Sequence, residues 1–405
     1  MLEALDELMS KRRLSVLLVY GNSTFGNPEL LYVVGASLAR GGVYLKRRRK
    51  TPILVVSNID VGAASKGLVS DVRTYSEYGY EKLLAKYGRD RVGPLLFDRI
   101  LRKHRVTGRI GLHGRNDASE ILDLSKQLRR LGHRVVGERH PSLLEAARET
   151  KSSLEVDKVR DVGSRTKRVF KKTIEFLEGC KRDEKHLIYE SEILTVGIVK
   201  TEIRRYLAEE NLAAPEDLIF AVGPRSADPH YTGEDGDLVL VDQPIVFDIF
   251  PQETGGYYFD MTRTFVIGKS SERIRTMYKS VSTAQQFAFD LAQAGCRAEA
   301  LMNAVCDHFS SEGYKTIRDL ARGDKIAEKI GFVHSLGHGI GLTIGEKPYL
   351  TVHSDDNLKV GHVFTVEPGL YDPEVGGVRI EDVVALTDSG MVNLTDCEKI
   401  LEIGA

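Results

Sequence analysis

Hydrophobic residues in the first third of the chain fall into short β-rich runs and longer runs with helical spacing. The short runs predict strands at residues 15–20, 43–45, 52–57, 109–113 and 134–136. Apolar positions three and four residues apart predict helices at residues 80–87 and 118–131. Because strands and helices are interspersed in this part, we expect an α/β domain with a mixed sheet.

The pattern changes after Pro141. Long helices are predicted at residues 154–177, 190–210, 271–294 and 298–311. Strands are predicted at residues 238–241, 245–250, 256–266, 362–366 and 378–386. Long helices set apart from antiparallel strand pairs indicate an α+β domain. We therefore expect an N-terminal α/β domain of residues 1–149 and a larger α+β domain of residues 150–405.

The charge balance of the chain argues against a nucleic-acid or membrane partner. Its 57 Lys and Arg residues nearly balance 58 Asp and Glu, so no overall field attracts polyanions. No apolar run approaches the roughly 20 residues needed to span a bilayer, and the N-terminus lacks the features of a secretory signal. The four cysteines are scattered without a CxxC pair. These features predict a soluble, cytoplasmic, reduced protein.

One local exception is the basic run Lys46–Lys50, which lies between two expected strands. Such a run either contacts nucleic acid or forms a solvated hairpin turn. The hairpin turn is favoured, because a single short cluster on a neutral chain is weak evidence for nucleic-acid binding.

Two acidic residues lie inside neighbouring runs that otherwise predict buried strands. Asp248 lies in the first run and Asp260 in the second, and the glycines at 255–256 predict a hairpin turn between them. Alternation places Asp260, Thr262 and Thr264 on one face of the second strand. If that face is the one that carries Asp248, the two carboxylates converge.

A second pair of acids repeats this arrangement nearer the end of the chain. Glu367 ends one strand-like run, Glu381 lies in the next, and the glycines at 376–377 are expected to form the turn between them. An acid buried among apolar residues is costly without a partner, and four such acids gathered together would repel one another. Two divalent cations would balance the four negative charges, so the acids predict a metal site.

A histidine supplies the remaining expected ligand. His338 lies in the stretch Gly337-His-Gly-Ile-Gly341, where glycines let the backbone pack closely and leave the imidazole free to point into a crowded site. The stretch is not a GxGxxG nucleotide-binding loop, because Leu342 stands where the third glycine would fall.

These five residues lie, in order, in motifs that resemble those of the metallopeptidases with the pita-bread fold. That family includes prolidase (Xaa-Pro dipeptidase), aminopeptidase P and methionine aminopeptidase. The motifs are Asp248…Asp260-Met-Thr-Arg-Thr, Gly-His338-Gly-Ile-Gly, Glu367-Pro-Gly and Arg-Ile-Glu381-Asp. The resemblance implies a pita-bread catalytic domain preceded by the smaller α/β domain of the creatinase and prolidase branch. It also implies dinuclear metal-dependent hydrolysis of the peptide bond preceding proline, by a dipeptidase or an aminopeptidase.

The resemblance further implies cofactors, partners and residue roles. The cofactors would be two divalent ions of Mn, Co, Zn or Fe, the substrates short proline-containing peptides, and the assembly a homodimer. Glu367 is expected to act as general base as well as ligand. His230 matches a histidine that binds the scissile carbonyl or its oxyanion. His334 and Arg379 match substrate-binding residues of the proline-specific branch.

Gly345 departs from the family pattern. Most active members have a histidine at this position, which helps to stabilise the tetrahedral intermediate. The departure keeps open the alternative of a non-catalytic or attenuated pita-bread binding module. Two further alternatives are a metal-free amidinohydrolase of the creatinase kind, which the intact ligands disfavour, and methionine aminopeptidase, which usually lacks a leading α/β domain of this size.

Overall fold

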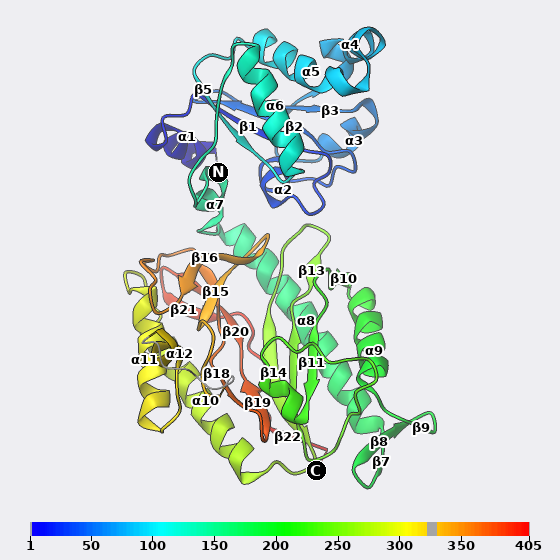
Figure 1. Cartoon of the computed structure of the whole chain (residues 1–405), viewed down its shortest axis with the longest axis vertical. Coiled ribbons are helices and arrows are strands. Elements are labelled where there is room, and N and C mark those ends of the chain that lie inside the picture. Colours follow the sequence, from blue (N-terminus) through cyan, green and yellow to red (C-terminus); the bar gives the residue numbers. More distant parts are fainter. Residues whose placement is uncertain (1, 322–329, 405) are drawn as a thin grey trace. The chain divides into compact units, whose positions relative to one another are not determined.

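The computed structural model describes residues 2–321 and 330–404, and its contacts divide the chain into two units, Met1–Arg148 and Glu149–Ala405 (Figure 1). Each unit has a hydrophobic core of its own. The expected boundary between residues 149 and 150, as a division into independently folding domains, stays a prediction. None of the described helices is both long and apolar enough to span a bilayer.

The N-terminal unit is built around a mixed sheet of order β4-β3-β2-β1-β5-β6. The β2 strand is antiparallel to β1 and β3, and the other neighbours are parallel. The strands are β1 Val16–Gly21, β2 Gly42–Arg47, β3 Ile53–Val56, β4 Asp71–Thr74, β5 Arg109–His113 and β6 Arg134–Val136. The helices are α1 Leu2–Lys11, α2 Pro28–Val34, α3 Val61–Ala64, α4 Tyr80–Tyr87, α5 Arg89–Lys103, α6 Ala118–Arg130 and α7 Leu143–Arg148. The sheet is mixed, as the pattern predicts.

The basic run Lys46–Lys50 lies where β2 ends and the chain turns towards β3. The expected hairpin is therefore present. The expectation of a solvated run is wrong for Lys46, whose side chain is buried. Its ammonium contacts Asp6 Oδ1 at 2.8 Å and donates to the carbonyl of Lys50, because a buried charge needs a partner.

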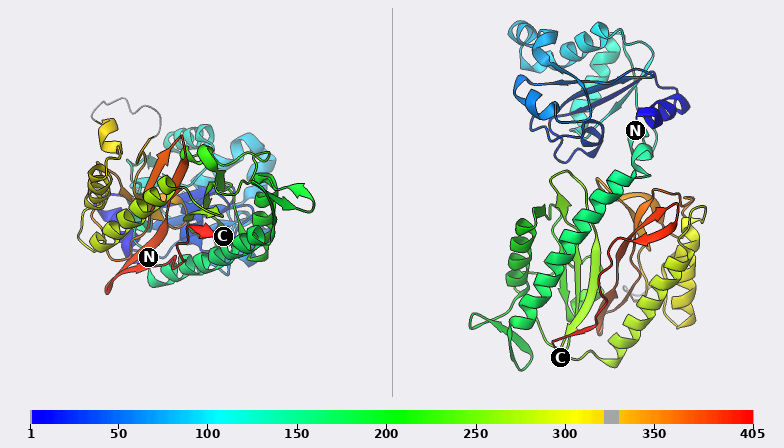
Figure 2. Two further views of the ribbon diagram at one scale, coloured as in Figure 1. Left: turned by 90° about the horizontal axis from the view of Figure 1, so that it is seen from below. Right: turned by 180° about the vertical axis from the view of Figure 1, so that it is seen from behind.

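In the C-terminal unit, strands lie between α8 and α9 on one side and α10 and α11 on the other (Figures 1 and 2). The helices are α8 Ser153–Gly179, α9 Val196–Glu209, α10 Glu272–Leu291, α11 Ala298–Ser311 and α12 Ile317–Ala321. A capping box begins α8, since the Ser152 and Glu155 side chains each accept from the other's backbone N–H. The Phe170 ring of α8 packs on Phe247 and Phe265 of the strands beneath it.

Two sheets carry most of the strands of this unit. Their orders are β11-β12-β14-β22 and β16-β15-β17-β20-β21. The strands are β11 Ile219–Val222, β12 Pro244–Ile249, β14 Met261–Ile267, β22 Glu402–Ile403, β15 Gly337–Ile340, β16 Ile344–Leu350, β17 Val363–Val366, β20 Asp382–Thr387 and β21 Gly390–Asn393. Smaller groups are the pair β18 Gly369–Asp372 with β19 Gly376–Arg379, the pair β10 Leu212–Ala213 with β13 Gln252–Glu253, and β7 Lys181–Asp183 with β8 His186–Tyr189 and β9 Glu192–Ile193.

Four elements of this unit differ from the sequence-based expectations. The strand expected at 256–266 begins only at Met261, as β14. The helix expected at 190–210 begins only at Val196, because Glu190 and Ser191 take positive φ in the turn between β8 and β9. The strand expected at 238–241 forms only isolated bridges, at Leu238 and Leu240. The single strand expected at 378–386 is divided into β19 and β20, which belong to different sheets.

Candidate metal centre

Asp248 and Asp260 come together through the antiparallel pairing of β12 and β14. Asp248 lies directly opposite Thr262, and residues that pair directly share a face of the sheet. Asp260 lies two residues before Thr262, so it projects from the same face. The expected convergence of the two acids is present, with the turn at residues 253–256.

Glu367 and Glu381 come together in a different way from the one expected. Glu367 immediately follows β17 and Glu381 immediately precedes β20, and these strands are antiparallel neighbours with Val366 opposite Asp382. The two acids therefore lie at the same end of one strand pair. The expected turn at Gly376–Gly377 is wrong, since both glycines lie within β19 and pair with β18.

His338 lies in β15, beside the strand that leads to Glu367. A Cβ at Gly337 would come within 2.0 Å of the Thr365 carbonyl oxygen, and one at Gly339 within 2.1 Å of the Lys347 carbonyl oxygen. Glycines flank the histidine because neighbouring strands approach too closely for side chains. His338 Nδ1 lies 3.1 Å from the carbonyl oxygen of Gly339, and a proton on Nδ1 leaves the Nε2 lone pair free.

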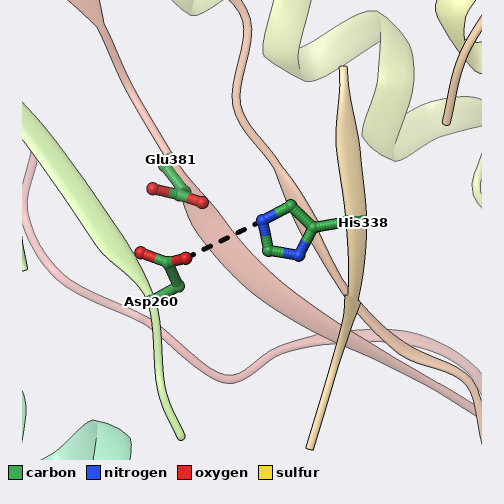
Figure 3. Close-up of side chains that lie close together, drawn as sticks. All are labelled: Asp260, His338 and Glu381. Carbon is green, nitrogen blue, oxygen red and sulfur yellow. Dashed lines mark ion pairs between the residues drawn. The ribbon is translucent and has the colours of Figure 1, made fainter. Parts of the chain in front are cut away.

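The Nε2 atom faces the acids. It lies 3.8 Å from Asp260 Oδ2 (Figure 3). It also lies 3.5 Å from Glu367 Oε1. One candidate ligand atom from each of Asp260, His338 and Glu381 lies within 4.8 Å of the others. All five sequence-predicted ligands, Asp248 included, line one cavity of about 310 Å³. The structure therefore brings the five side chains together, while their assignment as metal ligands stays a proposal.

The acids of this cavity are poorly compensated by the protein itself. Burial, followed by the charges of Glu381, Asp248 and Glu367, raises the pKa of Asp260 well above its ordinary value. Burial and the charges of Glu367 and Asp248 raise the pKa of Glu381 in the same way. Burial also raises the pKa of Glu367, against the opposing effects of His338 and Arg379. Such a cluster strongly favours an additional positive charge.

Three carboxylates of the cavity each have one oxygen without a hydrogen-bond partner among the described residues. Thr262 donates to Glu381 Oε2 at 2.7 Å, and Arg379 donates to Asp248 Oδ2 at 2.7 Å. Asp248 Oδ1, Asp260 Oδ1 and Glu381 Oε1 are buried and have no partner among the described residues. Unpartnered buried oxygens beside an imidazole are the donor set that divalent transition metals take, so the residues fit the implied cofactor.

Arg379 and His334, the expected substrate residues, belong to one hydrogen-bonded group on the wall of the cavity. Arg379 donates to the Tyr371 hydroxyl at 2.8 Å, and that hydroxyl lies 2.8 Å from His334 Nε2. Burial raises the pKa of Tyr371 to about 12, so its hydroxyl keeps the proton that it donates to the imidazole. Burial, followed by the charge of Arg379, lowers the pKa of His334 to about 3, and the ring is neutral.

His230 and Gly345 lie at more exposed positions. His230 follows the 3-10 helix Gly223–Ala227 and lines the cavity with an exposed side chain. Gly345 lies at the start of β16 with φ of +81°, a conformation that favours glycine. Its N–H lies 3.3 Å from His338 Nδ1. The position of the missing family histidine is thus adjacent to the candidate metal centre.

Two residues that support the site were not expected from the sequence. Thr365 donates to Glu367 Oε1 at 3.2 Å and accepts the backbone N–H of His338 at 3.1 Å. Its spacing of two residues from Glu367 on an extended segment is a signal that could have identified it. Tyr371 carries no such signal, because its approach to His334 and Arg379 depends on the pairing of β18 with β19.

Comparison with known proteins agrees with this geometry. The model of metallopeptidase family M24 matches residues 157–388. The Xaa-Pro dipeptidase of Pyrococcus furiosus is 34% identical over 294 residues, which are 70% of this chain and 78% of that protein. The X-Pro aminopeptidase of Thermotoga maritima has a TM-score of 0.77 and 23% identity, covering 97% of this chain and 99% of that chain. The prolidase of Pyrococcus horikoshii has a TM-score of 0.74 and 23% identity, covering 98% of each chain.

The two solved structures share the fold along nearly the whole chain. They confirm the expected fold class, a pita-bread catalytic domain preceded by a smaller α/β domain. The family model spans more than half of the sequence and includes all five candidate ligands. This chain belongs to metallopeptidase family M24.

Proposed function

We propose that this metallopeptidase hydrolyses the peptide bond preceding proline in short peptides, as an Xaa-Pro dipeptidase or aminopeptidase. The observation that carries the proposal is that three carboxylates of the cavity, Asp248, Asp260 and Glu381, each have a buried oxygen without a partner among the described residues, while Asp260 and Glu381 lie beside the His338 imidazole. The likeness to an Xaa-Pro dipeptidase supports the choice of substrate.

In this proposal Asp248, Asp260, His338, Glu367 and Glu381 hold two divalent cations of Mn, Co, Zn or Fe. When bound, such a pair supplies Lewis-acid chemistry that polarises a carbonyl and lowers the pKa of water. Three protein groups orient the ligands: Thr262 holds Glu381, Thr365 holds Glu367, and Arg379 holds Asp248.

Glu367 is the proposed general base. Its carboxylate lines the cavity, with Oε1 held by the Thr365 hydroxyl. It would take a proton from the attacking water and return it to the nitrogen of the leaving proline. His230, exposed on the cavity wall, would donate to the developing oxyanion. His334 and Arg379 would contact the substrate from the cavity wall, and the Tyr371 hydroxyl is hydrogen-bonded to both.

The alternative is a non-catalytic or attenuated binding module, and the specific observation behind it is Gly345. The chain has no imidazole at this position, and its backbone conformation favours glycine. The buried acids support catalysis instead, because a binding module has no need to keep four costly carboxylates together.

The decisive experiment is an assay of metal-reconstituted protein on Xaa-Pro dipeptides and on longer peptides that begin Xaa-Pro. The Glu367→Gln variant should lose turnover by about a hundredfold or more, since an amide accepts no proton at neutral pH. Metal content is measured alongside, so that loss of a ligand is not mistaken for loss of the base. Glu374→Gln, which changes an exposed acid, is the matched control and should keep full activity. Hydrolysis of neither peptide class by the metal-loaded protein would exclude the proposal.

We also propose a cytoplasmic homodimer, on the strength of the family resemblance. Light scattering at several protein concentrations tests the dimer, and cell fractionation tests the location.

A further inference from the structure

The cavity contains one carboxylate that is not used by the candidate metal centre. Five acids line it, namely Glu216, Asp248, Asp260, Glu367 and Glu381, and only Glu216 lies outside the candidate ligand set. Glu216 is exposed, and no lysine, arginine or histidine of the described residues forms an ion pair with it. Its negative charge therefore faces the cavity without a direct ion-pair partner among the described residues.

Two structural links fix Glu216 beside the candidate metal centre. It precedes β11 by three residues, and Ile219, the first residue of that strand, lies directly opposite Asp248. The Tyr258 hydroxyl donates to Glu216 Oε1 at 3.3 Å, and Tyr258 lies two residues before Asp260. The Tyr258 side chain is itself buried. The carboxylate thus lines the cavity and is oriented by this hydrogen bond, while it remains exposed to solvent.

Apolar side chains also line the cavity that Glu216 shares with the candidate ligands. Ile219, Phe250 and Ile344 line the same cavity and are buried or half-buried. A lysine or arginine side chain lays its methylene stem along apolar surface and keeps its charged end in a polar setting. A cavity lining that combines apolar side chains with an exposed acid suits such a side chain.

We propose that Glu216 is a specificity-determining residue that selects peptides with lysine or arginine immediately before the proline. This inference rests on the proposed Xaa-Pro peptidase function. A charged group of the substrate would form an ion pair with the Glu216 carboxylate, and the hydrogen bond from Tyr258 would keep that carboxylate in place.

The test compares kcat/KM of the metal-loaded enzyme for Lys-Pro, Met-Pro and Glu-Pro. Methionine matches the length of lysine without its charge. An ion pair at an exposed cavity mouth gives an advantage of roughly two- to fivefold to Lys-Pro over Met-Pro, and Glu-Pro should be the poorest substrate. The preference should shrink in 1 M salt, where the screening length falls to about 3 Å.

Variants distinguish a direct contact between Glu216 and the substrate from a general electrostatic effect of nearby acids. Glu216→Gln should make Lys-Pro and Met-Pro equal, and Glu216→Lys should favour Glu-Pro. Glu253→Gln is the matched control, because Glu253 lies in the nearby β13 but does not line the cavity. It should leave the preference unchanged.

Three results would overturn the inference. Equal rates for Lys-Pro and Met-Pro in the wild type would show no selection. An equal loss on all three substrates in Glu216→Gln would mean that Glu216 binds the α-ammonium group instead. The same change of substrate preference in Glu253→Gln would indicate a general electrostatic effect and no direct contact with Glu216.

If no Xaa-Pro peptide is cleaved, the proposed function fails, and calorimetric binding of Lys-Pro and Met-Pro still tests Glu216. Tighter binding of Lys-Pro that is lost in Glu216→Gln supports the selection, and equal binding refutes it.

Discussion

Glu381 and Asp382 are adjacent in the chain and equally buried, with exposures of 1% and 0%, yet their environments are opposite. Although burial opposes it, Arg263 and Lys399 hold the pKa of Asp382 below its ordinary value. Among the described residues, the Thr262 hydroxyl donates a hydrogen bond to Glu381. Burial and the charges of Glu367 and Asp248 raise the pKa of Glu381, against the smaller opposing effects of Thr262 and Arg379. Successive side chains of extended backbone point to opposite faces, so one residue separates the two environments.

The contrast shows what distinguishes a structural buried acid from a functional one. Asp382 meets Arg263 at 2.7 Å and Lys399 at 3.1 Å, so the chain supplies the charges that balance it. Among the described residues, the acids on the other face have one arginine or lysine in contact with them, Arg379, which forms an ion pair with Asp248. Burial alone therefore does not identify a ligand. A buried carboxylate for which the chain supplies no cation is the stronger sign of a metal site.

Removing the arginine that balances the charge of Asp382 should have the largest effect on stability. Arg263 is buried and donates to Asp382 and to several backbone carbonyls. Arg263→Met leaves these acceptors without their donor, and we expect a loss of about 3–5 kcal/mol in the free energy of unfolding. Urea denaturation measures it. Arg205→Met, which removes two ion pairs of an exposed arginine on α9, is the control and should change stability by less than about 1 kcal/mol. A loss below about 1 kcal/mol would contradict the structural role of the pair.

Binding of divalent cations to the cavity acids, which include Glu381, should stabilise the folded protein. At a hundredfold excess of Mn²⁺ or Co²⁺ over its Kd, binding to the native state adds about 2.7 kcal/mol. Thermal melting with and without chelator measures the gain. Asp260→Asn should abolish most of it and should not destabilise the metal-free protein, because it removes a repelling charge. An unchanged melting temperature, with no metal found by elemental analysis, would refute the dinuclear site.

The sequence predicts this site in part, and its two hairpins show why. Asp248 and Asp260 could be placed on one face because alternation and a glycine turn fix the register of β12 and β14. The same reasoning misplaced the turn at Gly376–Gly377. There glycine serves close packing, since a Cβ at Gly377 would lie 2.3 Å from the Ser226 carbonyl oxygen. Glycine in a strand marks a turn or a close approach, and only tertiary structure distinguishes them.

Long-range contacts account for most of what could not be predicted. Lys46 looked like part of a solvated basic run, but Asp6, forty residues earlier, pairs with it in the core of the N-terminal unit. Tyr371 contacts His334 and Arg379, and Glu216 lines the cavity, through long-range contacts that no local pattern encodes. The candidate ligands were recognisable because their motifs resemble a known family, whereas their supporting residues depend on the fold.

Glu149 is a second acid whose charge is compensated by neighbouring side chains, and its contribution to stability should depend on pH. A hydrogen bond from His362 and the charge of Lys359 lower the pKa of Glu149 from 4.5 to about 2, although burial acts in the opposite direction. A lowered pKa of the folded state contributes stability above pH 4.5, and this contribution is lost as the pH falls towards 2.

Glu149→Gln should therefore cost about 1–2 kcal/mol at pH 7, less than the full shift implies because solvent screens the group. The difference from wild type should vanish near pH 2, as measured by urea denaturation across that range. Glu374→Gln, which changes an exposed acid, is the control. A difference that is independent of pH would show that packing, and not charge, gives Glu149 its role.

The smallest expected effect concerns Gly345, where the family histidine is missing beside an otherwise complete set of acids. A side chain at φ of +81° strains the backbone, although a Cβ there would meet no atom within 4 Å. Gly345→Ala and Gly345→His should therefore lose a similar amount of stability, about 1 kcal/mol each. Comparing His with Ala isolates the imidazole from the strain. We expect Gly345→His to raise kcat on Xaa-Pro peptides by no more than about threefold over Gly345→Ala. A preorganised hydrogen-bond donor to the oxyanion contributes about 10²–10³ in rate. The expected gain is far smaller, because the left-handed backbone conformation does not direct the ring towards the oxyanion. A gain near a hundredfold would show that the loop can place the ring at the oxyanion. Equal inactivity of wild type, Ala and His, with metal bound, would favour the binding module over the peptidase.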